Sequence, residues 1–204
     1  ISALPQVLQP TTGFVYNTNH SPFHSTEGRE NPVFTDSTMG YETLENNRSK
    51  RFEALLQPLN KVSYEDFKRI KFDRQFPSTF YFPYNIDSLF LLDETKYPDI
   101  ADLVVQLKNW DKKGEATNIG AGTFFMVYHD IVPKRSKYMK QGFIGLEDAA
   151  EILRSTKATM LQQFNRTNLQ LGDVQKLVRG NVALPLPGLP DQLAPLYSIP
   201  YKEG

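Results

Sequence analysis

The sequence predicts a mainly α-helical fold with a few short strands. Apolar residues recur at three- and four-residue spacing in several segments, most extensively in residues 146–164. Capping patterns and prolines stand at the ends of these segments, where helices begin and end. Residues 13–19 read as a short buried strand, because they place bulky and aromatic side chains together after a glycine. Helices therefore supply most of the expected structure.

The first third of the chain is predicted to be a strand, a long loop and two helices. After the strand at 13–19, residues 20–40 hold polar residues and prolines without a sustained period, which indicates a loop. Residues 41–57 carry one mainly apolar stripe at helical spacing, and Pro58 is expected to end that helix. Ser63 with Asp66 forms a capping-box pattern and predicts a second short helix that runs to residues 69–71.

Downstream, the pattern becomes more strongly helical. Residues 76–84 form an aromatic connector broken by proline, and residues 87–93 suggest one or two helical turns. Pro98 opens a helix whose apolar face ends at Trp110. Two further helices are predicted at 120–131, which Pro133 ends, and at 146–164. The helical period is lost after Asn165, and the proline-rich stretch at 184–200 is predicted to be extended and irregular.

The composition is that of a folded domain without strong charge. The 204 residues include 23 Lys and Arg against 23 Asp and Glu. The chain therefore carries no net positive charge that would attract nucleic acid. No apolar window is long enough to span a membrane. The absence of cysteine excludes disulfides, thiol nucleophiles and zinc–thiolate sites. We expect one partial domain over 1–204: strand and loop at 1–40, a helical region at 41–165 and an irregular tail at 166–204.

No self-contained active site stands out in the sequence. His20 and His24 lie four residues apart in a loop, and without a clustered third ligand they favour a solvated or locally hydrogen-bonded pair over a metal site. His129 lies in an apolar helix and is interpreted as a core residue. The glycines at 120 and 122 fit neither dinucleotide nor P-loop spacing. We therefore predict no metal ligands and no cofactor-binding residues.

Several ordered segments nevertheless resemble the large chain of the penicillin acylase (penicillin amidase) family of N-terminal nucleophile hydrolases. Residues 13–22 read GFVYNTNHSP, similar to a family strand of pattern Gly-aromatic-Val-x-Asn-x-Asn-x-x-Pro, and residues 47–56 read NRSKRFEALL, similar to the helix that follows it. Further similarities are the leucines followed by Trp-Asp at 103–111 and the stretches at 172–175, 179–180 and 184–188. The resemblance covers almost the whole chain in order.

The resemblance implies an internal fragment of a four-layer αββα sandwich with its helical part. In that family a serine at the start of the large chain attacks the amide carbonyl, and its own α-amino group acts as the base. The family's oxyanion-hole asparagine falls on Asn19, and its active-site arginine, which orients the site, falls on Arg48. From the residues alone, Asn19 also reads as a turn residue after a strand, and Arg48 as a solvated helix charge.

The resemblance also implies what this chain lacks. It begins with Ile1 rather than serine. We therefore expect the nucleophile to lie upstream and the fragment alone to be inactive. The expected partners are the small chain, the nucleophile-bearing remainder of the same acylase and a small-molecule amide substrate, with no nucleic acid and no membrane span. No cofactor is expected, although calcium is possible in the parent enzyme without an assignable ligand here.

The implied reaction is hydrolysis of the amide of an N-acyl small molecule: a β-lactam side chain, an acyl-homoserine lactone or a lipopeptide acyl group. Autocatalytic cleavage, a role in antibiotic biosynthesis and a periplasmic or secreted location are expected from the resemblance alone. The alternative is a non-catalytic helical interaction module whose aromatic segment at 76–84 binds a partner or glycan. A protein of that kind should be stable and monodisperse by itself, whereas an acylase fragment should expose apolar surface.

Overall fold

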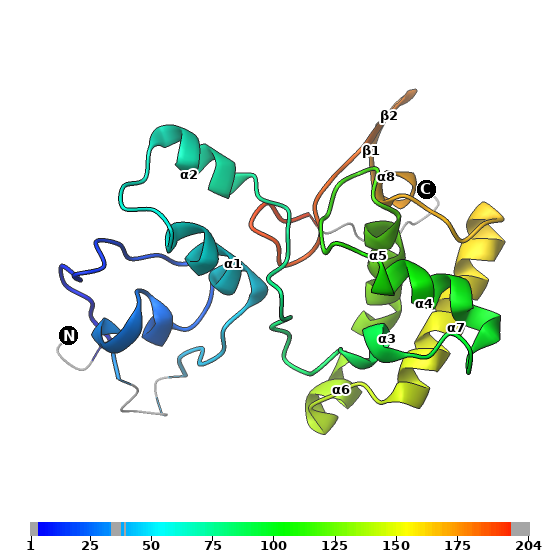
Figure 1. Ribbon diagram of the computed structural model, residues 1–204, viewed down its shortest axis with the longest axis horizontal. Helices are drawn as coiled ribbons and strands as arrows, with labels where there is room; N and C mark the ends of the chain where they lie inside the picture. The colour runs from blue at the N-terminus through cyan, green and yellow to red at the C-terminus, as the bar shows by residue number, and fades with distance from the viewer. Residues whose placement is uncertain (1–3, 34–37, 39, 197–204) are drawn as a thin grey trace.

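The computed structural model describes residues 4–33, 38 and 40–196, and these form two lobes (Figure 1). The described residues of the N-terminal lobe, up to residue 72, include two 3₁₀ turns and two helices: Pro22–His24, Gly28–Glu30, α1 Asn47–Leu56 and α2 Tyr64–Lys71. The C-terminal lobe begins at residue 73 and contains six helices and a hairpin among its described residues. Its elements are α3 Ser88–Leu91, α4 Ala101–Lys108 after a 3₁₀ turn at Pro98–Ile100, α5 Ile119–Ile131, α6 Arg135–Gln141 after a 3₁₀ turn at Val132–Lys134, α7 Leu146–Phe164, α8 Leu171–Val174, β1 Lys176–Arg179 and β2 Val182–Pro185.

Helix α5 is the centre of the C-terminal lobe and packs against α4, α7 and α8. Phe124 on α5 stacks on Trp110 with ring centroids 4.7 Å apart, and Phe76 meets both rings edge-on. Gly122 lets α5 approach the segment before α8 closely, because a Cβ at this position would lie 2.2 Å from the carbonyl oxygen of Leu169. The apolar cluster of buried residues in this lobe runs from Phe76 to Leu189.

The N-terminal lobe is held mainly by hydrogen bonds. Asn46 and Ser49 cap α1 reciprocally, and Ser63 and Asp66 do the same for α2, so each helix begins where its first free amides find acceptors. The buried polar residues of this lobe are His20, Ser21, Thr26, Asn47 and Ser49. Arg51 on α1 joins the lobe to the next one through two hydrogen bonds to Asp73, of 2.9 and 2.8 Å.

Most of the predicted helices are confirmed. Helix α7 has the predicted bounds of 146–164, and α2, α4 and α5 lie where capping and periodicity place them. Helix α3 provides the short helical segment expected at 87–93, and residues 76–84 form a non-helical connector. The fold is mainly helical with a two-stranded sheet, as the sequence predicts. None of the described helices is long and apolar enough to cross a membrane.

Three predictions of local structure are wrong. Residues 13–19 form no strand, because no strand among the described residues lies beside this segment to pair with it. The amide of Tyr16 donates instead to the carbonyl of Ser25, which follows the first 3₁₀ turn. The helix predicted at 41–57 begins at residue 47, because the Asn46 cap sets its start. The segment after residue 165, predicted to be irregular, contains α8 and the β1–β2 hairpin; residues 197–204 of the predicted tail lie outside the described residues.

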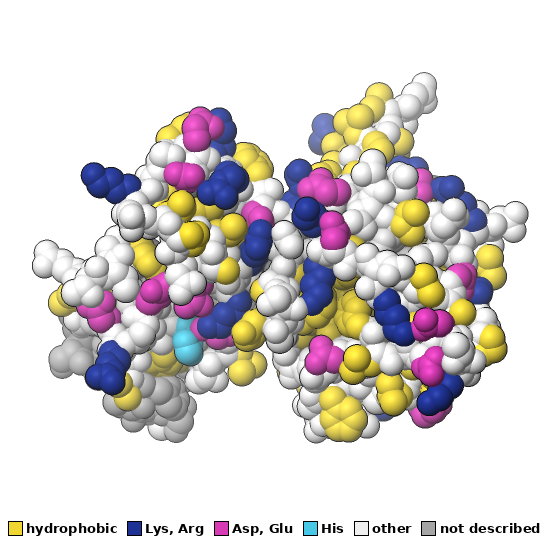
Figure 2. All heavy atoms as spheres, in the orientation of Figure 1, with side chains coloured by type: hydrophobic (Ala, Val, Ile, Leu, Met, Phe, Trp, Pro, Cys, Tyr) yellow, Lys and Arg dark blue, Asp and Glu magenta, His cyan; other side chains and the backbone are white. Residues whose placement is uncertain are grey.

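The hairpin projects from the C-terminal lobe. Its strands pair antiparallel with Leu177 opposite Leu184 and Arg179 opposite Val182, joined by a turn with Gly180 at φ +55°. All eight strand residues are exposed, including four large apolar side chains: Leu177, Val178, Val182 and Leu184. Figure 2 shows these apolar atoms at the projecting edge, while charged side chains of both signs are scattered over the visible face of both lobes.

Candidate active site

The largest cavity we describe lies where the two lobes meet. Its volume is about 580 Å³, and one wall is formed by Asn19, Arg48 and residues 42–46 of the N-terminal lobe. The opposite wall comes from residues 81–83 of the connector, Tyr128 of α5 and Asp191. The cavity therefore joins one polar wall, with an amide and a guanidinium, to a wall that carries three aromatic rings.

Asn19 is placed in this cavity by the turn that follows residues 14–17. Its backbone has φ +59°, a left-handed conformation that asparagine tolerates better than most residues. The side chain of Asn17 accepts the Asn19 amide proton at 2.7 Å, and Asn46 Nδ2 donates to the carbonyls of Thr18 at 2.9 Å and Asn19 at 3.3 Å. The cap residue of α1 thus also fixes the turn that carries Asn19.

Arg48, in the first turn of α1, contacts Asn19 directly. Its Nη1 donates to Asn19 Oδ1 at 3.1 Å. A guanidinium has only donors, so the atom of Asn19 that faces it must be the acceptor Oδ1. The Asn19 Nδ2 group is thereby kept on the opposite side of the amide, and no partner for it occurs among the described residues. The structure brings together the two residues that the sequence singles out, 29 positions apart.

Asp191, which the sequence analysis did not single out, completes this group. Its Oδ1 accepts from Arg48 Nε at 3.0 Å, and its Oδ2 accepts from the backbone amide of Asn47 at 2.9 Å and from Asn47 Nδ2 at 2.7 Å. Both side chains of the Arg48–Asp191 pair are about three-quarters buried, at 25% and 22% exposure. The sole sequence signal near it is the Leu-Pro-Leu-Pro-Gly stretch at 184–188.

Asn47 ties the same helix start to the aromatic wall. It is 1% exposed, its Oδ1 accepts the Tyr81 amide proton at 2.8 Å, and its Nδ2 donates to the Tyr81 carbonyl at 3.3 Å. Its amide group therefore makes a two-point backbone contact with the connector. This buried side chain and the Arg48–Asp191 pair together link the polar wall of the cavity to the opposite wall.

A second polar cluster surrounds Glu45, which also lines the cavity. The carboxylate contacts His24 Nδ1 at 2.8 Å and Lys50 Nζ at 3.3 Å, and Ser49 Oγ donates to it. Burial favours the neutral form of Lys50, but the carboxylates of Glu45 and Glu53 outweigh it and hold the Lys50 pKa above its usual range. These contacts brace the loop that forms one cavity wall.

The two loop histidines are hydrogen-bonded within the protein. His20 Nδ1 lies 3.0 Å from Thr18 Oγ1, and its Nε2 lies 2.8 Å from the carbonyl oxygen of His24. Among the described residues no group of three or more His, Asp or Glu side chains could hold a metal ion. His129 lies on α5 with its ring 4.5 Å from that of Phe125, and burial lowers its pKa despite the opposing charge of Asp130.

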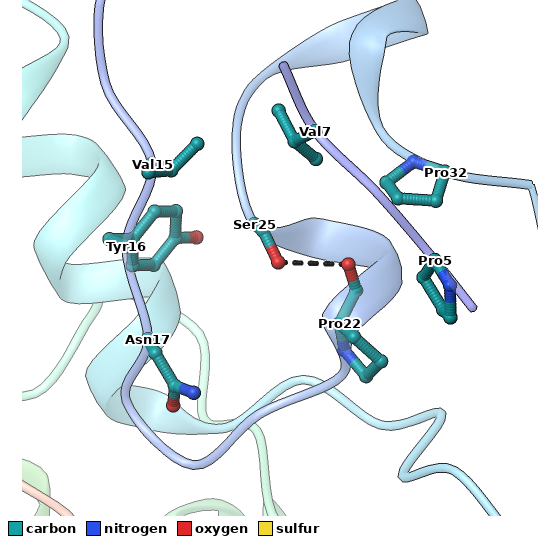
Figure 3. A pocket seen from close by; sticks show the side chains of 8 residues that line it. All are labelled: Pro5, Val7, Val15, Tyr16, Asn17, Pro22, Ser25 and Pro32. Atoms are coloured by element: carbon teal, nitrogen blue, oxygen red, sulfur yellow. Dashed lines mark hydrogen bonds between the residues drawn. The ribbon is translucent and has the colours of Figure 1, made fainter. Parts of the chain in front are cut away.

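A smaller cavity of about 360 Å³ lies on the outer side of residues 15–17 (Figure 3). Tyr16 and Val15 face it from one side, and Pro5, Val7 and Pro32 face it from the other. Ser25 Oγ donates to the Pro22 carbonyl at 2.8 Å, and burial raises the pKa of Tyr16 well above its usual range. Because no charged side chain lines this cavity, it offers less for catalysis than the cavity at Asn19.

Comparison with known proteins identifies a protein family. A family of proteins described as penicillin amidase matches residues 1–191, a span that contains Asn19, Arg48 and Asp191. No curated protein matches the chain.

Proposed function

The chain belongs to the penicillin amidase family, a family of hydrolases that act on amide C–N bonds, and from this premise we propose that it supplies part of the active site of an N-acyl amide hydrolase. Asn19 would be the oxyanion-hole donor and Arg48 the residue that orients it. The observation that carries the proposal is the 3.1 Å contact from Arg48 Nη1 to Asn19 Oδ1, which leaves the Asn19 Nδ2 donor for a ligand.

The chemistry requires such a donor. When a hydroxyl nucleophile attacks an amide carbonyl, its proton passes to a base and the carbonyl oxygen becomes an oxyanion. A fixed neutral donor such as Asn19 Nδ2 stabilises that charge, and one donor of this kind is worth about 3–4 kcal/mol in comparable sites. The tetrahedral intermediate then collapses, the C–N bond breaks, and the amine leaves with a proton. Water finally hydrolyses the acyl ester.

The nucleophile in this proposal is a serine in the remainder of the parent enzyme, whose α-amino group is the base. The residues that carry the resemblance include no counterpart of that serine or of its backbone oxyanion donor, so we expect this chain alone to be inactive. The parent would mature by autocatalytic cleavage into a small and a large chain and act in the periplasm or outside the cell. Calcium in the parent stays possible, with no ligand assigned here.

The cavity favours a small substrate with an apolar portion. Phe82, Pro83 and Tyr128 offer apolar surface across from Asn19. The charged lining residues are Arg48, Asp191, Glu42 and Glu45. Candidate substrates are a β-lactam side-chain amide, an acyl-homoserine lactone and a lipopeptide acyl amide. Hydrolysis of the first or last would place the enzyme in antibiotic metabolism.

The test is amide hydrolysis by the parent enzyme against chromogenic acyl amides and acyl-homoserine lactones. Asn19→Asp is the sharpest variant, because it tolerates φ +59° and still accepts from Arg48 but replaces the Nδ2 donor with a carboxylate oxygen. We expect its kcat, and that of Asn19→Ala, to fall by about 100-fold to 1,000-fold. Arg48→Ala should also lose turnover.

Two matched controls lie outside the cavity: Asn60→Ala and Arg69→Ala, both at exposed positions of the N-terminal lobe. They should retain full activity. If the parent hydrolyses substrate and Asn19→Asp does so equally well, the residue assignment is wrong although the family membership stands. If the parent neither cleaves itself nor hydrolyses any amide, the interaction-module alternative becomes the better explanation.

A further inference from the structure

Arg48 can orient Asn19 only if Arg48 itself is held. An arginine side chain has several rotatable bonds and loses rotamer entropy when it is fixed in one geometry. The contact with Asn19 uses a single donor, Nη1, and a single contact leaves the guanidinium free to rotate about it. A second, independent contact to the same rigid plane removes that freedom.

Asp191 makes this second contact. Its Oδ1 accepts from Arg48 Nε at 3.0 Å, so the guanidinium plane is fixed at Nε by a carboxylate and at Nη1 by an amide oxygen. The pair is partly withdrawn from water, which strengthens a charged hydrogen bond. The Arg48 guanidinium thus has a defined direction before any substrate enters.

Asp191 is in turn fixed by its own surroundings. Its Oδ2 is committed to the two donors of Asn47, at 2.9 and 2.7 Å, which leaves Oδ1 directed at Arg48. The neighbouring Gln192 is 1% exposed; its Nε2 donates to the carbonyl of Arg74 at 2.8 Å and its Oε1 accepts from the amide of Leu189 at 2.9 Å. The carboxylate is therefore attached to the C-terminal lobe by a buried anchor.

We propose that Asp191 is a positioning residue for the amide hydrolysis: it holds Arg48, which holds Asn19 Oδ1, so that Asn19 Nδ2 is presented to the developing oxyanion. This inference rests on the proposed function of Asn19 and Arg48. Asp191 itself touches neither the reacting bond nor the oxyanion in this scheme. It acts through two successive hydrogen bonds, from Asp191 to Arg48 and from Arg48 to Asn19.

The experiment is a double-mutant cycle in the parent enzyme with Asp191→Asn, Arg48→Ala and the double variant. Asparagine accepts the left-handed φ of +61° at this position but carries no charge. We expect Asp191→Asn to lower kcat about tenfold with little change in KM, the size of effect seen when outer partners of active-site groups are removed. In the Arg48→Ala background, Asp191→Asn should have no further effect, because both act through the same contact.

Asp191→Gly is the second variant, since glycine adopts φ +61° freely and offsets part of any loss of stability. It should reproduce the fall in kcat of Asp191→Asn. The matched control is Asp99→Asn, which removes the carboxylate of another Asp–Arg pair, 2.6 Å from Arg154 and remote from the cavity; its kcat should equal that of the unmodified enzyme.

The outcomes separate the two proposals. If Asn19→Asp and Arg48→Ala lose turnover while both Asp191 variants keep full kcat, the positioning role is overturned and the proposed function stands. If the losses of Asp191→Asn and Arg48→Ala are additive, Asp191 acts through the fold rather than through Arg48, and the inference fails. If Arg48→Ala keeps full activity, the assignment of Arg48 fails, and the role of Asp191 fails with it.

Discussion

The two lobes bury different kinds of side chain. The main apolar cluster lies in the C-terminal lobe, from Phe76 to Leu189, and no described residue of the N-terminal lobe belongs to it. Among the described residues of the N-terminal lobe, the buried apolar side chains are Leu56 and Ile70, whereas five buried side chains are polar. One lobe is thus stabilised by a continuous apolar core, and the other by hydrogen bonds with specific geometry.

This difference shows how the candidate site is assembled. A packed helical core tolerates little movement, so Tyr128 and the segment that carries Asp191 provide a rigid wall. Asn19 and Arg48 lie in the polar lobe, whose position depends on Asn47, Arg51 and Asp191. The placement of Asn19 and Arg48 relative to the opposite wall therefore depends on a few directional hydrogen bonds between the lobes rather than on apolar packing.

The largest expected effect is in the apolar core. Phe124→Ala removes a ring that is 1% exposed and stacks on Trp110, and it should lower the free energy of unfolding by about 3–5 kcal/mol. Chemical denaturation followed by helical circular dichroism would measure the loss. Val105→Ala on α4, at a position that is 40% exposed, is the control and should cost far less. Equal costs for the two variants would contradict the assignment of a packed core.

A smaller and local effect is expected at the junction of the lobes. Asn47→Ala removes the two contacts with Tyr81 and one donor to Asp191, and unmet buried groups of this kind cost about 1–3 kcal/mol. Amide hydrogen exchange should become faster at the start of α1 and in the Tyr81 segment, with no change in α7.

Asn60→Ala is the exposed asparagine control for this prediction and should leave exchange unchanged. If exchange in α7 increases in Asn47→Ala as much as in α1, the lobes open as one cooperative unit, and the contrast between them does not extend to their stability.

The smallest effect is a pH dependence confined to the C-terminal lobe. Burial lowers the pKa of His129 below its usual value of 6.5, with Asp130 opposing the shift only partly. The unfolded chain then binds this proton more readily than the folded chain, so the stabilising contribution is present above pH 6.5 and is lost as the pH falls through the lowered pKa. Unfolding free energies measured on both sides of this range should fall with acidification, and less so for His129→Gln. If the unfolding free energies of the two proteins depend on pH in the same way, the assignment of this pH dependence to His129 is wrong.

Local patterns predict the helical lobe well. Helix α7 has the expected bounds because both ends are marked locally: its apolar period begins at Leu146, and Asn165 adopts the left-handed conformation that ends it. The strand expected at 13–19 is absent because a strand requires a hydrogen-bonded neighbour, which residue composition cannot reveal. The hairpin at 176–185 was missed because residues after 165 show no helical period, and the prolines of the adjoining stretch at 184–200 indicated irregular structure.

The site could be predicted only in part. Asn19 and Arg48 were found through the family resemblance, since each by itself also reads as a turn residue or a solvated charge. Their catalytic roles stay predictions, although the structure places the side chains 3.1 Å apart. Asp191 lies 143 positions beyond Arg48, and no local pattern connects an acidic residue in a proline-rich stretch to a helix so far upstream.

The distance along the chain between Arg48 and Asp191 sets an order of assembly. A ribosome releases α1 and the Asn19 turn first, and all of α3 to α8 must follow before Asp191 emerges. The carboxylate that meets Arg48 is therefore among the last groups to be synthesised in the matched span of 1–191. Under our proposal, a nascent chain cannot hold Arg48 and Asn19 in their final geometry until its helical lobe has left the ribosome.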